Sequence, residues 1–191
     1  VFGAGLVDDL VPAGPRGLRE HLRSVASGHM TTGLLKVAVI AGSAVLVIVL
    51  QPERQTSVAV LGVVLLAACS NVWNGLDVVP GRSLKAFLLP ALAFAIWGTP
   101  SNAPAVVGLL VGAIVVLPFD LRETAMLGDA GANLLGFAAG IALYDALPDP
   151  WVAVAAGIAV GLNVVAETVS FSGVIERIPP LRWVDALGRR V

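Results

Sequence analysis

Charged side chains are scarce in this chain: they make up 13% of its 191 residues, against about 25% in an ordinary soluble domain. Only one cysteine is present, Cys69, which excludes a disulfide within the chain, and its apolar surroundings predict a small buried residue. A net charge of −1 gives no electrostatic basis for binding a polyanion, so nucleic acid is not an expected partner. Apolar residues are abundant at 57%, with a mean hydropathy of +0.89. This composition predicts an integral membrane protein.

Six apolar stretches are present, and long runs without strict alternation predict helices rather than membrane β-strands. They cover about residues 34–50, 57–69, 84–97, 105–119, 130–147 and 151–168. Tight turns with Pro or Gly are expected at 51–54, 98–100 and 147–150, all on one side. No repeat or linker divides the chain, so the sequence predicts an all-α, polytopic membrane helical bundle of about six transmembrane helices, as one domain over residues 1–191.

The basic residues set an expected orientation. If the segment before the first stretch is inside, eleven Lys and Arg residues lie inside and only Arg54 lies outside. The eleven are Arg16, Arg19, Arg23, Lys36, Arg82, Lys85, Arg122, Arg177, Arg182, Arg189 and Arg190. This predicts a plasma-membrane protein with its polar motifs on the cytoplasmic side. The acidic residues divide ten to three in the same direction, which the orientation rule does not require.

Asp8 and Asp9 end an apolar, helix-like run. Neighbours on a helix point about 100° apart, so we expect the two carboxylates to have different roles. Two ionised carboxylates about 4 Å apart repel by roughly 4 kcal/mol at an effective dielectric near 20, so a cation or base is expected close by. The alternative is an ordinary solvated helix end capped by Asp.

Asp129 stands in the segment Leu127-Gly128-Asp129-Ala130-Gly131, directly before the fifth apolar stretch. A carboxylate at the membrane surface offers a hard oxygen ligand to Mg²⁺, which keeps several waters and binds substrate phosphates. The amides at the helix start are expected to assist with a phosphate oxygen. The alternative is that Asp129 only caps this helix.

Asn71, Asn74 and Asp77 follow one another at a spacing of three, which places them on one face of a helix. They are expected to hydrogen-bond a base, ribose or phosphate of a substrate. Lys36, Arg82 and Arg182 are candidate cations for pyrophosphate or for anionic lipid headgroups, although the orientation rule alone accounts for many basic residues on this side. His21 and His29 are expected to be solvated loop residues.

Taken in order, these elements resemble the polyprenyl-phosphate N-acetylhexosamine-1-phosphate transferases of glycosyltransferase family 4, a family that includes phospho-MurNAc-pentapeptide translocase and the GlcNAc-1-phosphate transferases. The resemblance implies Mg²⁺-dependent transfer of a sugar-1-phosphate from a UDP-sugar to a polyprenyl phosphate at the cytoplasmic face, with release of UMP, in cell-envelope glycan synthesis such as that of peptidoglycan. It implies that Asp129 binds Mg²⁺, that Asp8 and Asp9 serve the metal or the lipid phosphate, and that Asn74 and Asp77 hold the nucleotide or sugar. Catalytic roles therefore fall on Asp8, Asp9 and Asp129, with Asp129 and Asp8 as metal ligands. A homodimer is compatible with the sequence.

The chain also departs from the family pattern. Pro12 stands where members carry a further Asp or Lys, the second Asp expected after Asp77 is missing, and Pro179 to Trp183 replaces a His-rich triplet. The family has about three further helices before the paired Asp, and this chain opens at Val1 inside an apolar run, so we expect the natural start to be missing. The departures favour a divergent member.

Two other readings compete with the transferase. A transporter or a lipid-phosphate-binding scaffold, or a catalytically inactive homologue, would also carry Asp and Gly at helix ends. A transporter should place ionisable groups near the middle of its spans, whereas here nearly all lie at the inner ends, which favours chemistry at the surface. A CDP-alcohol phosphotransferase would need an Asp-Gly-x-x-Ala-Arg signature that the sequence lacks.

Overall fold

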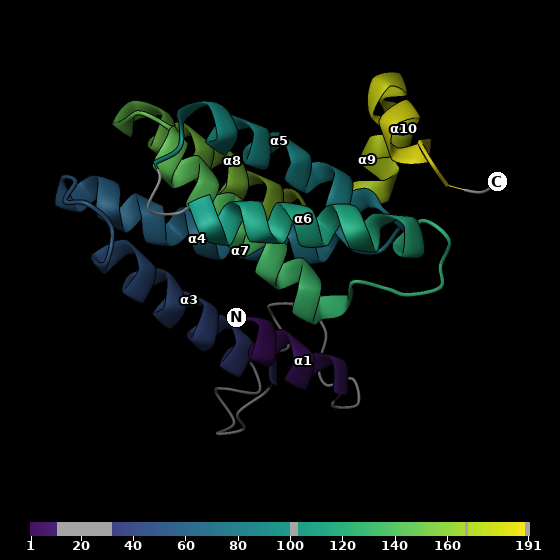
Figure 1. Cartoon of the computed structure of the whole chain (residues 1–191), viewed down its shortest axis with the longest axis horizontal. Helices are drawn as coiled ribbons and strands as arrows, with labels where there is room; N and C mark the ends of the chain where they lie inside the picture. The colour runs from purple at the N-terminus through teal and green to yellow at the C-terminus, as the bar shows by residue number, and fades with distance from the viewer. Residues whose placement is uncertain (11–31, 100–102, 167, 190–191) are drawn as a thin grey trace.

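The computed structural model describes residues 1–10, 32–99, 103–166 and 168–189, and all secondary structure in these ranges is helical (Figure 1). The helices are α1 (Phe2–Leu10), α3 (Thr32–Val49), α4 (Thr56–Leu76), α5 (Arg82–Trp97), α6 (Ala103–Asp120), α7 (Gly128–Ala146), α8 (Asp149–Ala166), α9 (Phe171–Arg177) and α10 (Pro179–Ala186). The predicted all-α bundle is confirmed.

Each of the six apolar stretches forms one helix, from α3 to α8. In the described residues, α4, α6 and α8 are long and apolar enough to cross a membrane, and the apolar part of α3, Gly33–Val49, is shorter. The largest boundary error is at α4, which continues to Leu76 instead of ending near residue 69. Polar residues of this last part face other helices: Ser70 Oγ donates to the carbonyl oxygen of Asn133 on α7 at 2.9 Å. Their polarity therefore does not end the helix.

The turns that connect the long helices gather at two opposite ends of the bundle (Figure 1). At one end, Arg54 Nη1 donates to the carbonyl oxygen of Leu147 at 3.3 Å and lies 3.4 Å from an oxygen of Asp149. Close by, the backbone N–H of Thr99 donates to Asp145 at 2.8 Å. The expectation that these three turns share a side is confirmed. The other end holds the start of α7, the α4–α5 turn, α1, α9 and α10.

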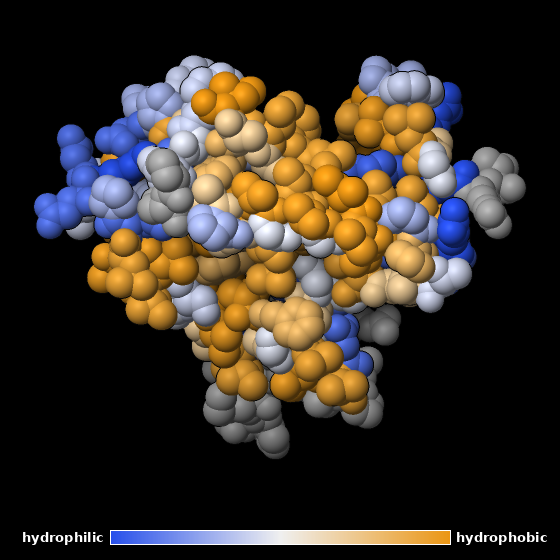
Figure 2. All heavy atoms as spheres, viewed as in Figure 1, coloured by the Kyte–Doolittle hydropathy of each residue, from blue (hydrophilic) through white to orange (hydrophobic). Residues whose placement is uncertain are grey.

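The core is built around α7, which packs most extensively on α4. Gly136 and Gly140 allow this close contact, since a Cβ at Gly136 would lie 2.4 Å from the carbonyl oxygen of Cys69 and one at Gly140 would lie 2.7 Å from the Leu66 Cα. Small residues at helix contacts are typical of membrane proteins, where packing and not the hydrophobic effect brings helices together. The outer surface between the two ends is apolar (Figure 2).

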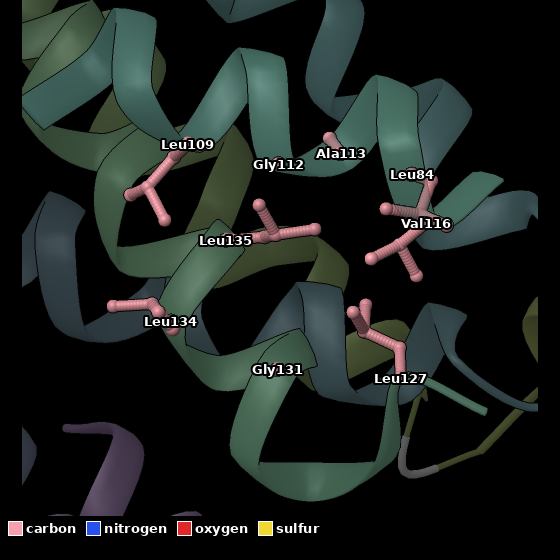
Figure 3. Close-up of a pocket in the computed structure, with 9 residues that line it drawn as sticks. All are labelled: Leu84, Leu109, Gly112, Ala113, Val116, Leu127, Gly131, Leu134 and Leu135. Carbon is pink, nitrogen blue, oxygen red and sulfur yellow. The ribbon is translucent and has the colours of Figure 1, made fainter. Parts of the chain in front are cut away.

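One small apolar pocket lies between α5, α6 and α7 (Figure 3). Its volume is about 120 Å³, and its lining consists of aliphatic, alanine and glycine residues: Leu84, Leu109, Gly112, Ala113, Val116, Leu127, Gly131, Leu134 and Leu135. Because no polar side chain lines it, the pocket offers no side-chain ligand for a metal ion or a phosphate. Polar chemistry therefore has to be sought elsewhere at this end of the bundle.

Candidate active site

Lys36 of α3 lies between two carboxylates. Its ammonium nitrogen is 2.6 Å from Asp8 Oδ2 on α1 and 2.7 Å from Asp129 Oδ2 on α7. The three side chains are partly exposed, with 12%, 23% and 33% of Lys36, Asp8 and Asp129 accessible. The expectation of a cation beside the paired Asp residues is confirmed, and this cation is Lys36. Three helices that are distant in sequence thus converge on one point.

Asp9 has a different role from Asp8, as the helical spacing predicts. Its two carboxylate oxygens accept hydrogen bonds from the backbone N–H groups of Asp129 and Ala130, each at 3.0 Å. Asp9 therefore satisfies the free amides at the start of α7 from a neighbouring helix, where a negative charge also interacts favourably with the helix dipole.

The alternative that Asp129 only caps α7 is wrong. Asp129 lies inside the first turn, and the cap position is Leu127, which makes no side-chain capping bond. The expected help of the helix-start amides to a phosphate stays a prediction, and the amides of Asp129 and Ala130 here donate to Asp9. The sequence did not reveal that Asp9, 120 positions before Asp129, accepts from the amides at the start of α7.

Glycine makes the contact between α1 and α7 close enough for these bonds. A Cβ at Gly5 would lie 2.5 Å from the Cα of Ala130, a distance that real structures do not show. Gly128 has φ +65°, a left-handed conformation that favours glycine, and a Cβ there would lie 3.1 Å from an oxygen of Asp9. Gly128 and Asp129 therefore start α7 in direct contact with Asp9.

Asp77 caps the C-terminal end of α4, near this cluster. The pKa of Asp77 is raised to about 6, mainly by burial and next by the Asp120 carboxylate, while hydrogen bonds to Ser83 and to the backbone of Gly128 act in the opposite direction. Asp120 is itself buried and accepts from the backbone N–H of Gly81 at 2.6 Å. This carboxylate holds the α4–α5 turn against the end of α6.

Asn71 and Asn74 do not present one shared row of polar groups. The amide of Asn71 donates to Asn163 on α8, and Asn163 in turn donates to the carbonyl oxygens of Ala68 and Ala159. In contrast, the side-chain oxygen of Asn74 is buried and has no hydrogen-bond partner among the described residues. Asn71 thus joins α4 to α8, whereas Asn74 keeps a free acceptor. The predicted binding of substrate by either remains untested.

Arg82 makes contacts that the sequence did not suggest. Its guanidinium forms a two-pronged pair with Asp185 of α10, with distances of 2.8 and 3.0 Å, and donates to Ser172 of α9 at 3.0 Å. Only 6% of Arg82 is exposed. The Arg82 guanidinium lowers the pKa of Asp185. A substrate-binding role for Arg82 stays a prediction, and it would have to coexist with these bonds. Arg182 is exposed on α10.

The sequence patterns did not identify three polar residues that make structural contacts. These are Asp120, Asn133 and Asp185. Asn133 Nδ2 donates to the carbonyl oxygen of Asp129 at 2.6 Å, a bond between residues four apart within α7. Asn133 could have been found from the sequence, because it lies one helical turn after Asp129. No local pattern marks Asp185, whose partner is 103 positions away. Arg16, Arg19, Arg23, Arg190 and both His residues lie outside the described residues.

Comparison with known proteins identifies the family. No curated protein and no solved structure matches the chain. The family model for glycosyl transferase family 4 matches residues 1–146 of the 191. The matched part contains the convergent residues Asp8, Lys36 and Asp129, and it ends with α7. The chain therefore belongs to glycosyl transferase family 4, and its family supports the role of a membrane sugar-phosphate transferase.

Proposed function

We propose that this protein transfers an N-acetylhexosamine-1-phosphate from a UDP-sugar to a polyprenyl phosphate at the cytoplasmic face of the plasma membrane, with Mg²⁺ as cofactor. The observation that carries the proposal is the meeting of Asp8 Oδ2 and Asp129 Oδ2 at one cation, the ammonium group of Lys36. Such an arrangement suits a reaction between two phosphorylated substrates, in which positioning and neutralisation of charge dominate catalysis.

Converging carboxylates support a role of this cluster beyond packing. Asp8 and Asp129 meet at the ammonium group of Lys36, and Asp9 accepts from the backbone at the start of α7. Carboxylates that converge at a partly exposed position attract cations, and a divalent ion is one that they would bind.

The donor set fits Mg²⁺. Among the described residues, no group of three or more His, Cys, Asp and Glu side chains surrounds one position, as a closed protein site for a metal would require. Mg²⁺ is usually held by one or two carboxylates together with water and substrate phosphates, and Asp8 and Asp129 provide two converging oxygens. These two residues would hold the ion, which when bound neutralises charge on the reacting phosphates.

The other residues position the reactants. Asp9 fixes the first turn of α7 and with it the direction of Asp129. Lys36, released from one carboxylate, offers its ammonium group to a substrate phosphate. Asn74 would contact an N–H or O–H group of the nucleotide sugar if its buried oxygen, which has no partner among the described residues, became accessible on binding. A lipid phosphate oxygen then forms a bond to the phosphorus that carries the sugar, the bond from this phosphorus to UMP breaks, and UMP leaves.

The distribution of basic residues supports the cytoplasmic orientation. In the described residues Lys36, Arg82, Lys85, Arg122, Arg177, Arg182 and Arg189 belong to segments at the end that holds the cluster (Figure 1), and Arg54 lies at the opposite end. Membrane proteins keep Lys and Arg on the cytoplasmic side. The proposed site would thus face the compartment that contains nucleotide sugars.

A transfer assay tests the proposal. Purified protein, Mg²⁺, undecaprenyl phosphate and a panel of radiolabelled UDP-sugars should give label in the lipid phase. Asp129→Asn should lower the rate by about 10²-fold or more, because the neutral amide would hold Mg²⁺ less well and the charge of the reacting phosphates would be less neutralised. Asp149→Asn is the matched control, since it changes the same functional group at the opposite end of the bundle, where Asp149 pairs with Arg54.

The same assay distinguishes the scaffold alternative. If the protein binds undecaprenyl phosphate but transfers label from no donor, or if Asp129→Asn transfers as fast as the unaltered chain, the transferase proposal is wrong. If the protein accepts a sugar donor that carries a nucleotide other than UDP, the transferase proposal stands and only the identity of the donor changes.

A further inference from the structure

Helix α10 combines an apolar side with a polar side. Leu181 and Val184 are three residues apart and Trp183 precedes Val184, so these side chains share one broad arc of the helix, and the cap residue Leu187 follows Val184 at the same spacing of three. All four are exposed, with Trp183 66% accessible. Arg182 and the buried Asp185 occupy the remaining arc. We propose that α10 lies in the headgroup region of the bilayer as an interfacial helix, with this apolar arc facing the acyl chains.

The direction of α9 and α10 fits such a position. The long helices run along the bundle axis between its two ends, whereas α9 and α10 stand across that direction and project sideways at the end that holds the Lys36 cluster (Figure 1). If the long helices cross the bilayer, a helix that projects across them at their ends lies along the membrane surface. Interfacial helices adopt this orientation, with the apolar face inserted at the boundary of headgroups and acyl chains.

Apolar residues are exposed both on the bundle and on this segment. The lateral side of the bundle is apolar, and in Figure 2 the segment of α9 and α10 also shows apolar residues, with hydrophilic residues along its outer edge and where it meets the bundle. An apolar surface on a soluble segment would usually be covered by another part of the protein. If the long helices cross a bilayer, that bilayer is the natural covering, because the exposed apolar residues of α10 stand beside the apolar side of the bundle. The pair of Trp183 and Arg182 is typical of membrane interfaces, where aromatic rings and snorkelling Arg side chains gather.

A rigid contact with α5 fixes which side of α10 faces outward. Arg82 holds Asp185 through two hydrogen bonds, and the ammonium group of Lys85 donates to the carbonyl oxygens of Val184, Asp185 and Leu187 at 3.0, 2.6 and 3.2 Å. The last carbonyls of α10 thus bind a cation, as helix C-termini favour. Since Asp185 is fixed against the bundle, α10 cannot roll freely. This contact keeps the apolar arc in one direction.

Labelling at neighbouring positions tests this placement, and it does not depend on transferase activity. Trp183→Cys and Arg182→Cys are each reconstituted as the full chain in vesicles of phosphatidylcholine and phosphatidylglycerol and labelled with an environment-sensitive fluorophore. Cys69 is buried and should remain unlabelled. We expect the label at position 183 to be quenched by nitroxide lipids and protected from aqueous iodide, and the label at position 182 to be several-fold more accessible to iodide.

Two further variants test whether the result at position 183 reflects the placement of α10 and not a local effect of the substitution. Leu187→Cys belongs to the apolar arc and should behave like Trp183→Cys. Asp185→Ala releases α10 from Arg82 and should reduce the difference between positions 182 and 183. Equal access of iodide to both positions in the chain with Asp185 intact would overturn the proposal. Protection of both positions without any quenching by nitroxide lipids would overturn it as well, since protein and not lipid would then cover α10.

Discussion

Two charged contacts lie at the end of the bundle that holds the start of α7, and they differ in burial and in geometry. At the first, one ammonium group, that of Lys36, faces the carboxylates of Asp8 and Asp129, and all three side chains remain partly exposed. At the second, the Arg82 guanidinium meets Asp185 with matched geometry, and only 6% and 9% of the two side chains is exposed. Arg189 adds another cation to Asp185 at 2.7 Å.

The two contacts therefore suit different roles, one in holding the fold and the other in binding a ligand. The buried Arg82 and Asp185 side chains are occupied by hydrogen bonds to each other, so removing one of them should mainly affect stability. At the Lys36 contact, by contrast, two partly exposed carboxylates converge on one point, which is an arrangement that a cation can bind. The matched family region, residues 1–146, contains the whole first contact but only the Arg82 side of the second.

The largest effect should come from replacing Gly5, which allows α1 to pack closely against α7. Gly5→Ala puts a methyl group 2.5 Å from the Ala130 Cα, so α1 has to move away from α7 and carry Asp8 and Asp9 with it. A displacement of about 1 Å at reacting groups can lower a rate by about 10²-fold, and we expect a loss of this size in the transfer assay. Gly3→Ala is the control on the same helix, because a Cβ there meets nothing within 4 Å. Equal activity of the two variants would contradict the observed α1–α7 contact.

Breaking the second contact should affect stability more than chemistry. Arg82→Ala leaves Asp185 buried without its main partner, which typically costs about 3–5 kcal/mol. The thermal midpoint in detergent should fall clearly, and Arg82→Lys should restore it only in part, since Lys lacks the planar two-pronged donor. The double variant Arg82→Ala with Asp185→Ala should be less destabilised than the two single effects added together. Loss of transfer activity at an unchanged thermal midpoint would instead support substrate binding by Arg82.

The smallest effect concerns Asp77, which belongs to neither contact. Its pKa is raised to about 6 in the folded chain from 3.8, so between these values the folded state binds more protons than the unfolded state, and stability falls as the pH rises. Asp77→Asn removes the buried charge. Without substrates, the thermal midpoint of this variant relative to the unaltered chain should be higher at pH 8 than at pH 4. A difference that does not change with pH would show that Asp77 is well solvated.

The sequence predicted the helices well because apolar runs determine them directly. All six runs became helices, and the polar residues Ser70 and Asn74 obscured the true end of α4 because a polar side chain can face a neighbouring helix as easily as it can end one. The separate roles of Asp8 and Asp9 followed from helical geometry alone. Such inferences need only local spacing.

The partners of the site residues were harder to predict, because they depend on how distant helices pack. The sequence named Lys36 as a phosphate ligand but gave no reason to place it between Asp8 and Asp129, which are 28 and 93 positions away. It assigned Arg82 to a substrate, whereas the structure pairs it with Asp185. The start of α7 was treated as an isolated helix end, although Asp9 comes from another helix to cap it. Each of these contacts rests on close packing that single residues do not reveal.

The central claim is that Asp8 and Asp129 serve one divalent cation, and binding of Mn²⁺ as a paramagnetic substitute for Mg²⁺ tests it most directly. The titration is followed by electron paramagnetic resonance in the presence of a UDP-sugar that the protein accepts, with Asp149→Asn as the control. We predict that Asp8→Asn and Asp129→Asn each weaken Mn²⁺ binding several-fold, and that the double variant loses less than the two single effects combined, because both residues contribute to the same site. Unchanged affinity in either single variant would contradict the account.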